Sequence, residues 1–307
     1  MKLKSIGATT RVDRHGMRMT KEVLESMVTQ INSPKEALPV GVEHDLIIPP
    51  IGKILTATLV QLDEGEHGVE IVQEIFEKTG TFSFETENFV ITKSEEDNRP
   101  FKIIDNDTDQ SCISVDPMNL GGYKKCKSAL NEIFGQKEHI EIVTHLRKAF
   151  IPDPEVIIHL GKFIAAGWFA KSIGKAITKD VTGKISKDIA SLYDSTKAFV
   201  KGFAIKCVPS GKEIPYIFIV PGPFVAEFTI MSPTPEQIVN FLNEEQVVKC
   251  LTKAHNLNKT FPLTKIQFLF QGVEWMINYM TCNDGSVIGT KEAFSRQNAK
   301  VTTMMKK

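Results

Sequence analysis

The segment from Val42 to Gly52 constrains the fold of this chain most, because it sets a His-Asp pair just before a rigid apolar turn. It reads Val-Glu-His-Asp-Leu-Ile-Ile-Pro-Pro-Ile-Gly. Pro49 and Pro50 fix the approach to the run 51–60, whose β-branched residues favour a strand. His44 and Asp45 are therefore expected at the rim of a β-structure, where a histidine can exchange protons near neutral pH.

The residues before this segment predict a strand, a turn and a helix. Residues 3–12 have a strand pattern, and Asp13 to Gly16 tolerate the backbone angles of a tight reversal. Thr20 can cap the helix that follows. Its apolar residues recur at helical spacing until Asn-Ser-Pro at 32–34 ends it.

The residues after this segment predict more strands. A Gly-rich turn at 63–68 follows the strand 51–60, and residues 69–76 continue as strand or short helix. Residues 80–87 then alternate aromatic with small or polar side chains. This alternation is typical of a half-buried strand and places Ser83 on the face opposite Phe82 and Phe84.

This order of elements resembles the prohead maturation serine proteases of tailed phages, which are similar in fold to the herpesvirus assemblins. The shared features are a strand, an Asp-x-x-Gly turn, a helix, the His-Asp pair, a Pro-Ile-Gly strand, a Gly turn and a serine-bearing strand. The resemblance covers about residues 3–116 and implies an assemblin-like β-barrel with helices. It also implies that His44 is the general base and Ser83 the nucleophile.

A serine needs an imidazole to take its proton, and the imidazole needs a third group to fix its tautomer. Asp45 is the first candidate for this group, and the alternatives are Glu85, Asp105, Asp107 and His139. A second serine competes with Ser83, since the order His44, Ser114, His139 suits an assemblin-like His-Ser-His triad. Ser83 is preferred because its strand lies closer in sequence to the Pro-Ile-Gly element.

A His-Asp pair beside prolines is, however, more often a structural turn whose carboxylate caps a backbone amide. A protease-type fold that has lost its activity and acts as an assembly or binding module is therefore the alternative reading.

The whole-chain composition excludes several classes of function. With 37 basic and 37 acidic residues, the chain has no basic footprint for nucleic acid. Its five cysteines are scattered and contain no C-x-x-C pair, which argues against a disulfide framework and a zinc site. The first residues have no secretion-signal pattern, so a cytoplasmic location is expected. We find no motif for a cofactor or a metal.

A length of 307 residues predicts more than one domain. We predict a prohead-protease-like domain at 1–116, a helical connector at 117–150 and an interaction domain at 151–307. The overall class is α+β, and we recognise no family for the second half.

Within the interaction domain, an apolar helix at 155–175 and a second helix at 184–203 are expected to form a helical hairpin before an α+β region. A membrane role for the first helix is disfavoured by His159, Lys162 and Lys171.

Several polar stretches are interpreted as solvent-exposed. Residues 94–100 are predicted to be an exposed acidic loop, Glu227 is assigned to the solvated face of its strand, and residues 302–307 are read as a frayed terminus. Helices are expected at 123–134 and 139–150. Pro-Gly-Pro at 221–223 is expected to link two strands, and Asn-Asp-Gly at 283–285 is a strong hairpin signal.

The sequence thus predicts a two-domain serine protease that acts on a protein substrate or assembly partner. The alternative is a catalytically inactive interaction protein, with a membrane-active helix as one variant of that reading. Homo-oligomer formation stays open.

Overall fold

The computed structural model describes residues 1–12, 18–42, 45–84, 87–103, 111–115, 122–134, 141–144, 156–175, 183, 186–192, 194, 196–198, 201–202, 214–231, 237, 243–272 and 274–306. The chain divides into two compact units. Unit 1 consists of Met1–Val42, Ile48–Ile103 and Tyr279–Lys307, and unit 2 consists of Glu43–Ile47 and Ile104–Asn278. The boundaries predicted at 116 and 150 fall outside the described residues, so they stay predictions.

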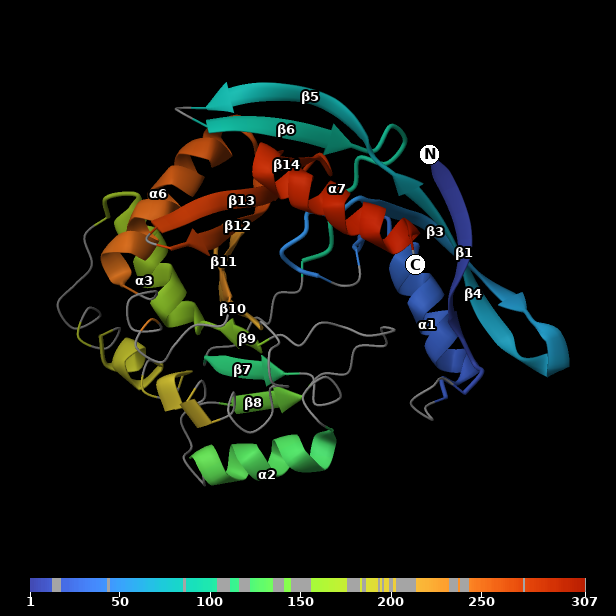
Figure 1. Cartoon of the computed structure of the whole chain (residues 1–307), viewed down its shortest axis with the longest axis horizontal. Coiled ribbons are helices and arrows are strands. Elements are labelled where there is room, and N and C mark those ends of the chain that lie inside the picture. The colour runs from blue at the N-terminus through green and yellow to red at the C-terminus, as the bar shows by residue number, and fades with distance from the viewer. Residues whose placement is uncertain are drawn as a thin grey trace. The chain divides into compact units, whose positions relative to one another are not determined.

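Unit 1 contains an antiparallel four-stranded sheet with α1 packed on it (Figure 1). In spatial order, its strands are β1 (Lys2–Thr9), β4 (His67–Ile75), β3 (Gly52–Gln61) and β2 (Leu38–Val40). A short 3₁₀ turn, η1 (Asp63–Gly65), joins β3 to β4.

The predicted β-barrel is wrong for the described residues, since these strands form an open sheet. Strand β2 is only three residues long and has Pro39 at its centre. It therefore offers no central backbone N–H to a further strand that could close a barrel.

Helix α1 (Lys21–Ile31) forms as its sequence predicts. Thr20 caps it by accepting a hydrogen bond from the Val23 amide, and Leu24 and Ile31 bury its apolar face. Asn32 ends the helix and binds β3, because its side chain donates to the Ala57 carbonyl at 2.8 Å and accepts from the Ala57 amide at 2.9 Å. Asn32 thus both ends α1 and forms hydrogen bonds with the backbone of β3.

The rest of unit 1 joins residues that lie far apart in the sequence. Strand β5 (Glu77–Phe84) pairs with β6 (Glu87–Lys93), which pairs with β14 (Val287–Thr290) near the end of the chain. Helix α7 (Lys291–Met305) packs on β6 and β14. The residues predicted to be a frayed terminus therefore belong largely to an ordered helix.

Unit 2 is built on a mixed sheet. In spatial order, its strands are the first half of β13 (Glu274–Cys282), β12 (Leu263–Gln271), β11 (Val225–Met231), β10 (Pro215–Val220), β9 (Val156–His159), β7 (Cys112–Val115) and β8 (Glu141–Thr144). Strands β9 and β10 are parallel, as are β11 and β12, whereas β10 and β11 form an antiparallel pair. Every residue of β9 and β10 is buried.

Three helices of unit 2 are described from end to end, α2 (Tyr123–Phe134), α3 (Lys162–Ser172) and α6 (Glu244–Thr260). Helix α3 packs on α6, and a 2.6 Å ion pair between Lys171 and Glu244 joins them.

Two predicted helices of this half are wrong in part. The run Val-Ile-Ile-His at 156–159 is strand β9 rather than the start of a helix, because its β-branched residues pair between β7 and β10. Residues 141–144 form β8 rather than a helix turn.

The described residues between 186 and 202 are helical, as predicted, but the rest of that helix lies outside the described residues. The helical hairpin therefore stays a prediction. None of the helices in the described ranges is long and apolar enough to cross a membrane.

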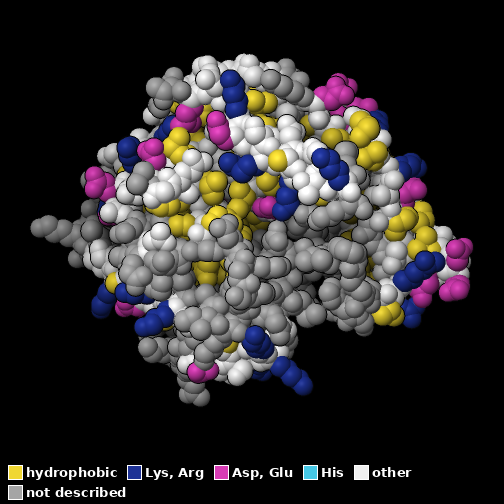
Figure 2. All heavy atoms as spheres, viewed as in Figure 1, with side chains coloured by type: hydrophobic (Ala, Val, Ile, Leu, Met, Phe, Trp, Pro, Cys, Tyr) yellow, Lys and Arg dark blue, Asp and Glu magenta, His cyan; other side chains and the backbone are white. Residues whose placement is uncertain are grey.

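On the coloured part of the face in Figure 2, Lys and Arg side chains are interspersed with Asp and Glu, and no large area there carries one sign of charge. This agrees with the balanced composition of the chain.

Candidate functional site

The predicted general base, His44, lies outside the described residues, as do Glu85, Asp105, Asp107 and His139. The proposed triads therefore stay predictions. Asp45, Ser83 and Ser114 are described, and their surroundings can be compared.

Ser83 is exposed near the end of β5, where it faces Asn88 of the neighbouring strand. Its hydroxyl donates a hydrogen bond to Asn88 Oδ1 at 2.6 Å. An amide oxygen is not a base, so this contact holds the hydroxyl without activating it. Ser83 must release Asn88 before an imidazole can take its proton.

Ser114 differs from Ser83 in accessibility. It lies in β7, between β8 and β9, and only 5% of its surface is exposed. A protein substrate cannot reach a buried hydroxyl without local opening. Of the two candidate serines, Ser83 is therefore the better placed for reaction with a large substrate.

Asp45 takes part in the turn that the alternative reading expects. Its Oδ1 accepts a hydrogen bond from the Ile47 amide at 3.1 Å, which is the pattern of an Asx turn. The carboxylate thereby fixes the turn of the backbone from Asp45 to Ile47.

Two buried amide side chains hold this turn in place. Gln267 donates from Nε2 to the Leu46 carbonyl at 2.9 Å, and Asn278 donates from Nδ2 to the Ile47 carbonyl at 2.7 Å. Gln267 is 0% exposed and Asn278 is 1% exposed. The backbone next to the His-Asp pair is thus bound by residues more than 200 positions later in the sequence.

The same amides belong to a polar row across adjacent strands, which we call the amide ladder (Glu227, Lys265, Gln267 and Asn278). Asn278 Nδ2 donates to Gln267 Oε1 at 2.6 Å, and Gln267 Nε2 donates to Glu227 Oε2 at 2.9 Å. Lys265 forms an ion pair with the same carboxylate oxygen at 3.2 Å. Glu227 is only 9% exposed, so its assignment to the solvated face is wrong. Its charge is tolerated inside because a cation and an amide compensate it.

The prolines that follow are held in a similar way within unit 1. Gln297 of α7 donates from Nε2 to the Pro49 carbonyl at 2.9 Å and to the Pro50 carbonyl at 3.3 Å. The amide side chains of Asn278 and Gln297 therefore bind the carbonyls of residues 47, 49 and 50.

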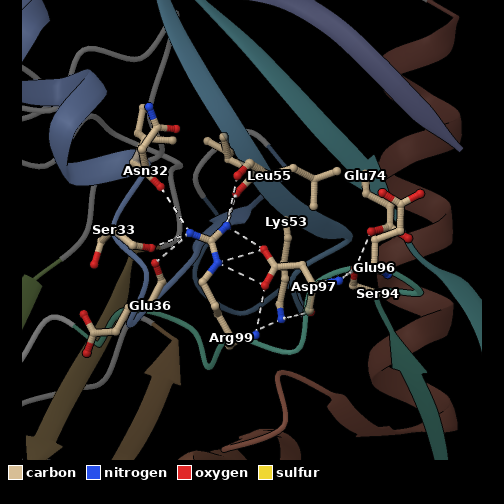
Figure 3. A network of polar contacts seen from close by, with 12 residues as sticks. Asn32, Ser33, Glu36, Lys53, Leu55, Glu74, Ser94, Glu96, Asp97 and Arg99 are labelled. Carbon is tan, nitrogen blue, oxygen red and sulfur yellow. Dashed lines mark hydrogen bonds and ion pairs between the residues drawn. The ribbon is translucent and has the colours of Figure 1, made fainter.

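The loop that was predicted to be exposed at 94–100 is exposed only in part, at Glu95, Glu96 and Asn98, and its other polar side chains join a second cluster in unit 1. We call it the Arg99 network, and it comprises Lys53, Glu74, Ser94, Asp97 and Arg99 (Figure 3). Arg99 Nη2 contacts Asp97 Oδ2 at 2.6 Å, and its Nε lies 3.0 Å from both carboxylate oxygens. Burial alone would raise the pKa of Asp97, but the hydrogen bonds from Arg99 outweigh burial and lower it.

The other side of the Arg99 guanidinium binds backbone carbonyls. Its shortest contacts are to Ser33, at 2.5 Å, and to Leu55, at 3.0 Å. Weaker contacts reach the carbonyls of Ile31, Glu36 and Ile54. Arg99 therefore joins the loop, the end of α1 and β3, which is a structural role.

Lys53 completes the network from β3. It is fully buried and donates to the carbonyls of Asp97, at 2.7 Å, and Arg99, at 2.5 Å. Its ammonium lies 5.1 Å from the centre of the Phe101 ring. Burial lowers the pKa of Lys53 to about 8, although the nearby Asp97 charge opposes that shift.

Ser94 and Glu74 anchor the start of the loop. The Ser94 hydroxyl donates to Glu74 Oε2, and the Glu95 amide donates to Glu74 Oε1 at 3.0 Å. A nearby pocket of about 410 Å³ is lined by charged groups that already pair with one another, Lys2 with Glu96 and Arg99 with Asp97. This pocket therefore offers little net charge to a ligand.

Sequence reasoning missed the amide ladder and the Arg99 network. A signal for the ladder was present, since Gln267 and Asn278 each interrupt an apolar strand. A polar residue in such a position is either on a solvated face or paired inside, and only the partners distinguish the two cases.

In the described ranges, no group of His, Cys, Asp or Glu side chains is arranged to hold a metal ion. No family model matches the chain, and no curated protein or solved structure matches it significantly.

Proposed function

We propose that this chain is a serine endopeptidase of the prohead maturation type, in which His44 activates Ser83 to cut a protein substrate. The observation that carries the proposal is the fixed backbone beside the His-Asp pair. Gln267 and Asn278 are buried polar residues, and both direct a donor at the carbonyls of 46 and 47. A general base must stay in one place, and supporting hydrogen bonds around it are how proteins achieve this.

The position of β5 also supports the proposal. Among the described residues, β5 is the last strand at one end of its sheet, and Ser83 is exposed on it. An extended peptide can add to such an edge through backbone hydrogen bonds. This mode of binding would bring a substrate carbonyl close to the Ser83 hydroxyl.

In the proposed reaction, Ser83 Oγ attacks the carbonyl carbon of the scissile bond while His44 accepts the hydroxyl proton. The tetrahedral intermediate collapses, the C–N bond breaks, and His44 gives the proton to the leaving amine. Water then hydrolyses the acyl-enzyme by the same route. The third group is Asp45, Glu85, Asp105, Asp107 or His139.

The test is labelling by a serine-reactive phosphonate, with the modified residue located by mass spectrometry. We expect one label on Ser83, lost in Ser83→Ala and His44→Ala, since loss of a triad member lowers the rate by orders of magnitude. Ser5→Ala is the matched control, because Ser5 is likewise an exposed strand serine beside an amide side chain, that of Gln73. A label on Ser114 would move the nucleophile to β7, and no label at all would contradict the peptidase proposal.

The second candidate function is an inactive protease-type module that mediates assembly. The specific observation that favours it is that two groups of the proposed site already have hydrogen-bond partners. The Ser83 hydroxyl donates to Asn88, and the Asp45 carboxylate accepts from the Ile47 amide. An unlabelled protein that forms a defined oligomer, as measured by light scattering after size-exclusion chromatography, would support this candidate.

A further inference from the structure

A pocket of about 510 Å³ lies along one side of α3, and we call it the α3 groove. Four residues of α3 and the C-cap residue Ile173 follow one helical stripe, Lys162, Ala166, Phe169, Ala170 and Ile173. Lys175, the turn at 221–223 and His255 of α6 complete its lining. All of these residues belong to unit 2.

The α3 groove exists because α3 is apolar almost all round. Its inner side buries Ile164 and Trp168 at 3% and 0% exposure. Its outer side still carries Ala166 and Ile173, and Ile173 is 43% exposed. Helices of water-soluble proteins normally place polar residues on the outer side, so an apolar outer stripe is a feature to explain.

The floor of the α3 groove is preformed. Phe169 packs edge-on against Phe224 with ring centres 5.2 Å apart. Gly222 lets the turn lie directly on the Phe169 ring, since a Cβ atom at this position would come within 2.2 Å of it. The aromatic floor is therefore held on both sides before any ligand arrives, which reduces the ordering cost of binding.

Two lysine side chains are among the described lining residues of the α3 groove, and both are basic. Lys162 stands at its start, Lys175 lies beyond the end of α3, and the described part of the lining contains no carboxylate. Glu244 of α6 is paired with Lys171 and is not among the described lining residues. His255 adds a ring N–H that can donate a hydrogen bond. The complementary ligand has an apolar middle and anionic groups toward its ends.

The length of the stripe fits a short extended peptide. From Lys162 to Ile173 the helix rises about 16 Å, at ~1.5 Å per residue. An extended chain covers that distance with about five residues, at ~3.3 Å each.

We propose that the α3 groove binds an extended acidic peptide of a partner protein, with apolar side chains over Phe169 and carboxylates near Lys162 and Lys175. The proposal does not depend on the peptidase activity, since the described lining of the pocket belongs to unit 2.

The experiment is fluorescence anisotropy of the full-length chain with a labelled peptide, Asp-Glu-Leu-Phe-Leu-Glu-Asp. We expect saturable binding that weakens as salt is raised, because exposed charges are screened. The same peptide with lysines in place of its acidic residues should bind at least about tenfold more weakly. Replacing its three apolar residues by serine should have a similar effect.

The variant Lys162→Glu/Lys175→Glu should weaken binding of the acidic peptide by at least about tenfold. The matched control is Lys249→Glu/Lys259→Glu, which changes the net charge equally at exposed positions of α6 outside the lining. Ala170→Glu tests the same site without touching a lysine and should also weaken binding.

Three results would overturn the proposal. One is no binding of the acidic peptide up to about 1 mM, the weakest affinity that a specific contact of this kind would have. Another is an equal loss in the groove variant and in the α6 control. The third is binding of laurate in the α3 groove without binding of the peptide, which would assign the pocket to a fatty acid.

Discussion

The Arg99 network of unit 1 and the amide ladder of unit 2 both bury polar side chains, but they satisfy them differently. Arg99 and Lys53 direct most of their donors at backbone carbonyls of nearby loops and strands. In the amide ladder, the side chains of Gln267 and Asn278 are hydrogen-bonded to each other. Their contacts with the backbone are to the carbonyls of residues 46 and 47. The Arg99 network therefore fixes the conformation of the loop at 94–100, whereas the amide ladder holds the turn at 45–47 against a sheet.

This difference has an energetic consequence. A buried charge that loses its partner costs more than a buried amide that loses one, because the desolvated charge is left uncompensated. The Arg99 network should therefore be the more sensitive of the two to single substitutions, and the following predictions test that ranking.

The largest expected effect is that of Arg99→Met. It leaves the Asp97 carboxylate, only 9% exposed, without its main partner, and it frees several carbonyls. We expect a loss of about 3–5 kcal/mol in the free energy of unfolding, measured by urea denaturation. Arg18→Met is the control, because Arg18 pairs with Glu66 at 2.7 Å while 61% exposed, and it should cost less than about 1 kcal/mol. Equal effects of the two variants would contradict the ranking.

The next effect is that of Gln267→Leu, which breaks the amide ladder in its centre. We expect a loss of about 2–3 kcal/mol, since buried partners on both sides lose a hydrogen bond. Amide hydrogen exchange at 45–47 should also become faster, because the turn is no longer held. Gln73→Leu, at a partly exposed position of β4, is the control and should change stability by less than about 0.5 kcal/mol.

Adding Asn278→Leu to Gln267→Leu should cost less than the sum of the two single changes, because removing both partners leaves fewer unsatisfied groups. Full additivity would show that the two amides do not act as one row.

The third effect is a pH slope rather than a loss at one pH. The pKa of Lys53 is lowered from 10.5 in the unfolded chain to about 8 in the folded protein, so the unfolded chain binds more protons between these values. Stability contributed by this group therefore rises with pH from about 8 to 10.5. Urea denaturation at several pH values should show this rise in the wild type relative to Lys53→Met. A parallel pH dependence in both proteins would refute it.

The smallest effect is expected for Asn88→Ala, which removes the hydrogen-bond partner of Ser83. Both residues are exposed, so this pair is a surface control for the two buried networks. The change should alter stability by less than about 1 kcal/mol. Because it releases the Ser83 hydroxyl, it should increase the rate of phosphonate labelling if Ser83 is the nucleophile. Slower labelling would show that Asn88 positions Ser83 for reaction.

Local signals predicted many elements of the fold correctly. The predicted helix at 123–134 matches α2, Thr20 caps α1, and Pro-Gly-Pro joins the antiparallel pair β10 and β11. Asn-Asp-Gly at 283–285 also forms the predicted hairpin between β13 and β14, with Gly285 at a positive φ of 72°. Each of these signals acts within a few residues, so a single sequence is enough to read it.

The burial of polar residues could not be read in the same way. Glu227 and the loop at 94–100 have compositions typical of a surface, but Glu227 and, within the loop, Ser94 and Asp97 are buried. The α7 helix was missed for a related reason, since its place depends on the pairing of β14 with β6. For the candidate site, the sequence identified an exposed serine and a turn. It did not identify the buried amide side chains that hold the turn in place.

The sequence by itself determined several turns, where α1 and α2 begin and end, and strands such as β3 and β10, because caps, prolines, glycines and β-branched residues act over short distances. Only the tertiary structure decided that 43–47 belongs to unit 2 and that 279–307 completes unit 1. It also decided which polar side chains are buried, because the free energy of a buried donor depends on its partner. For Gln267 that partner is a carbonyl 221 residues away.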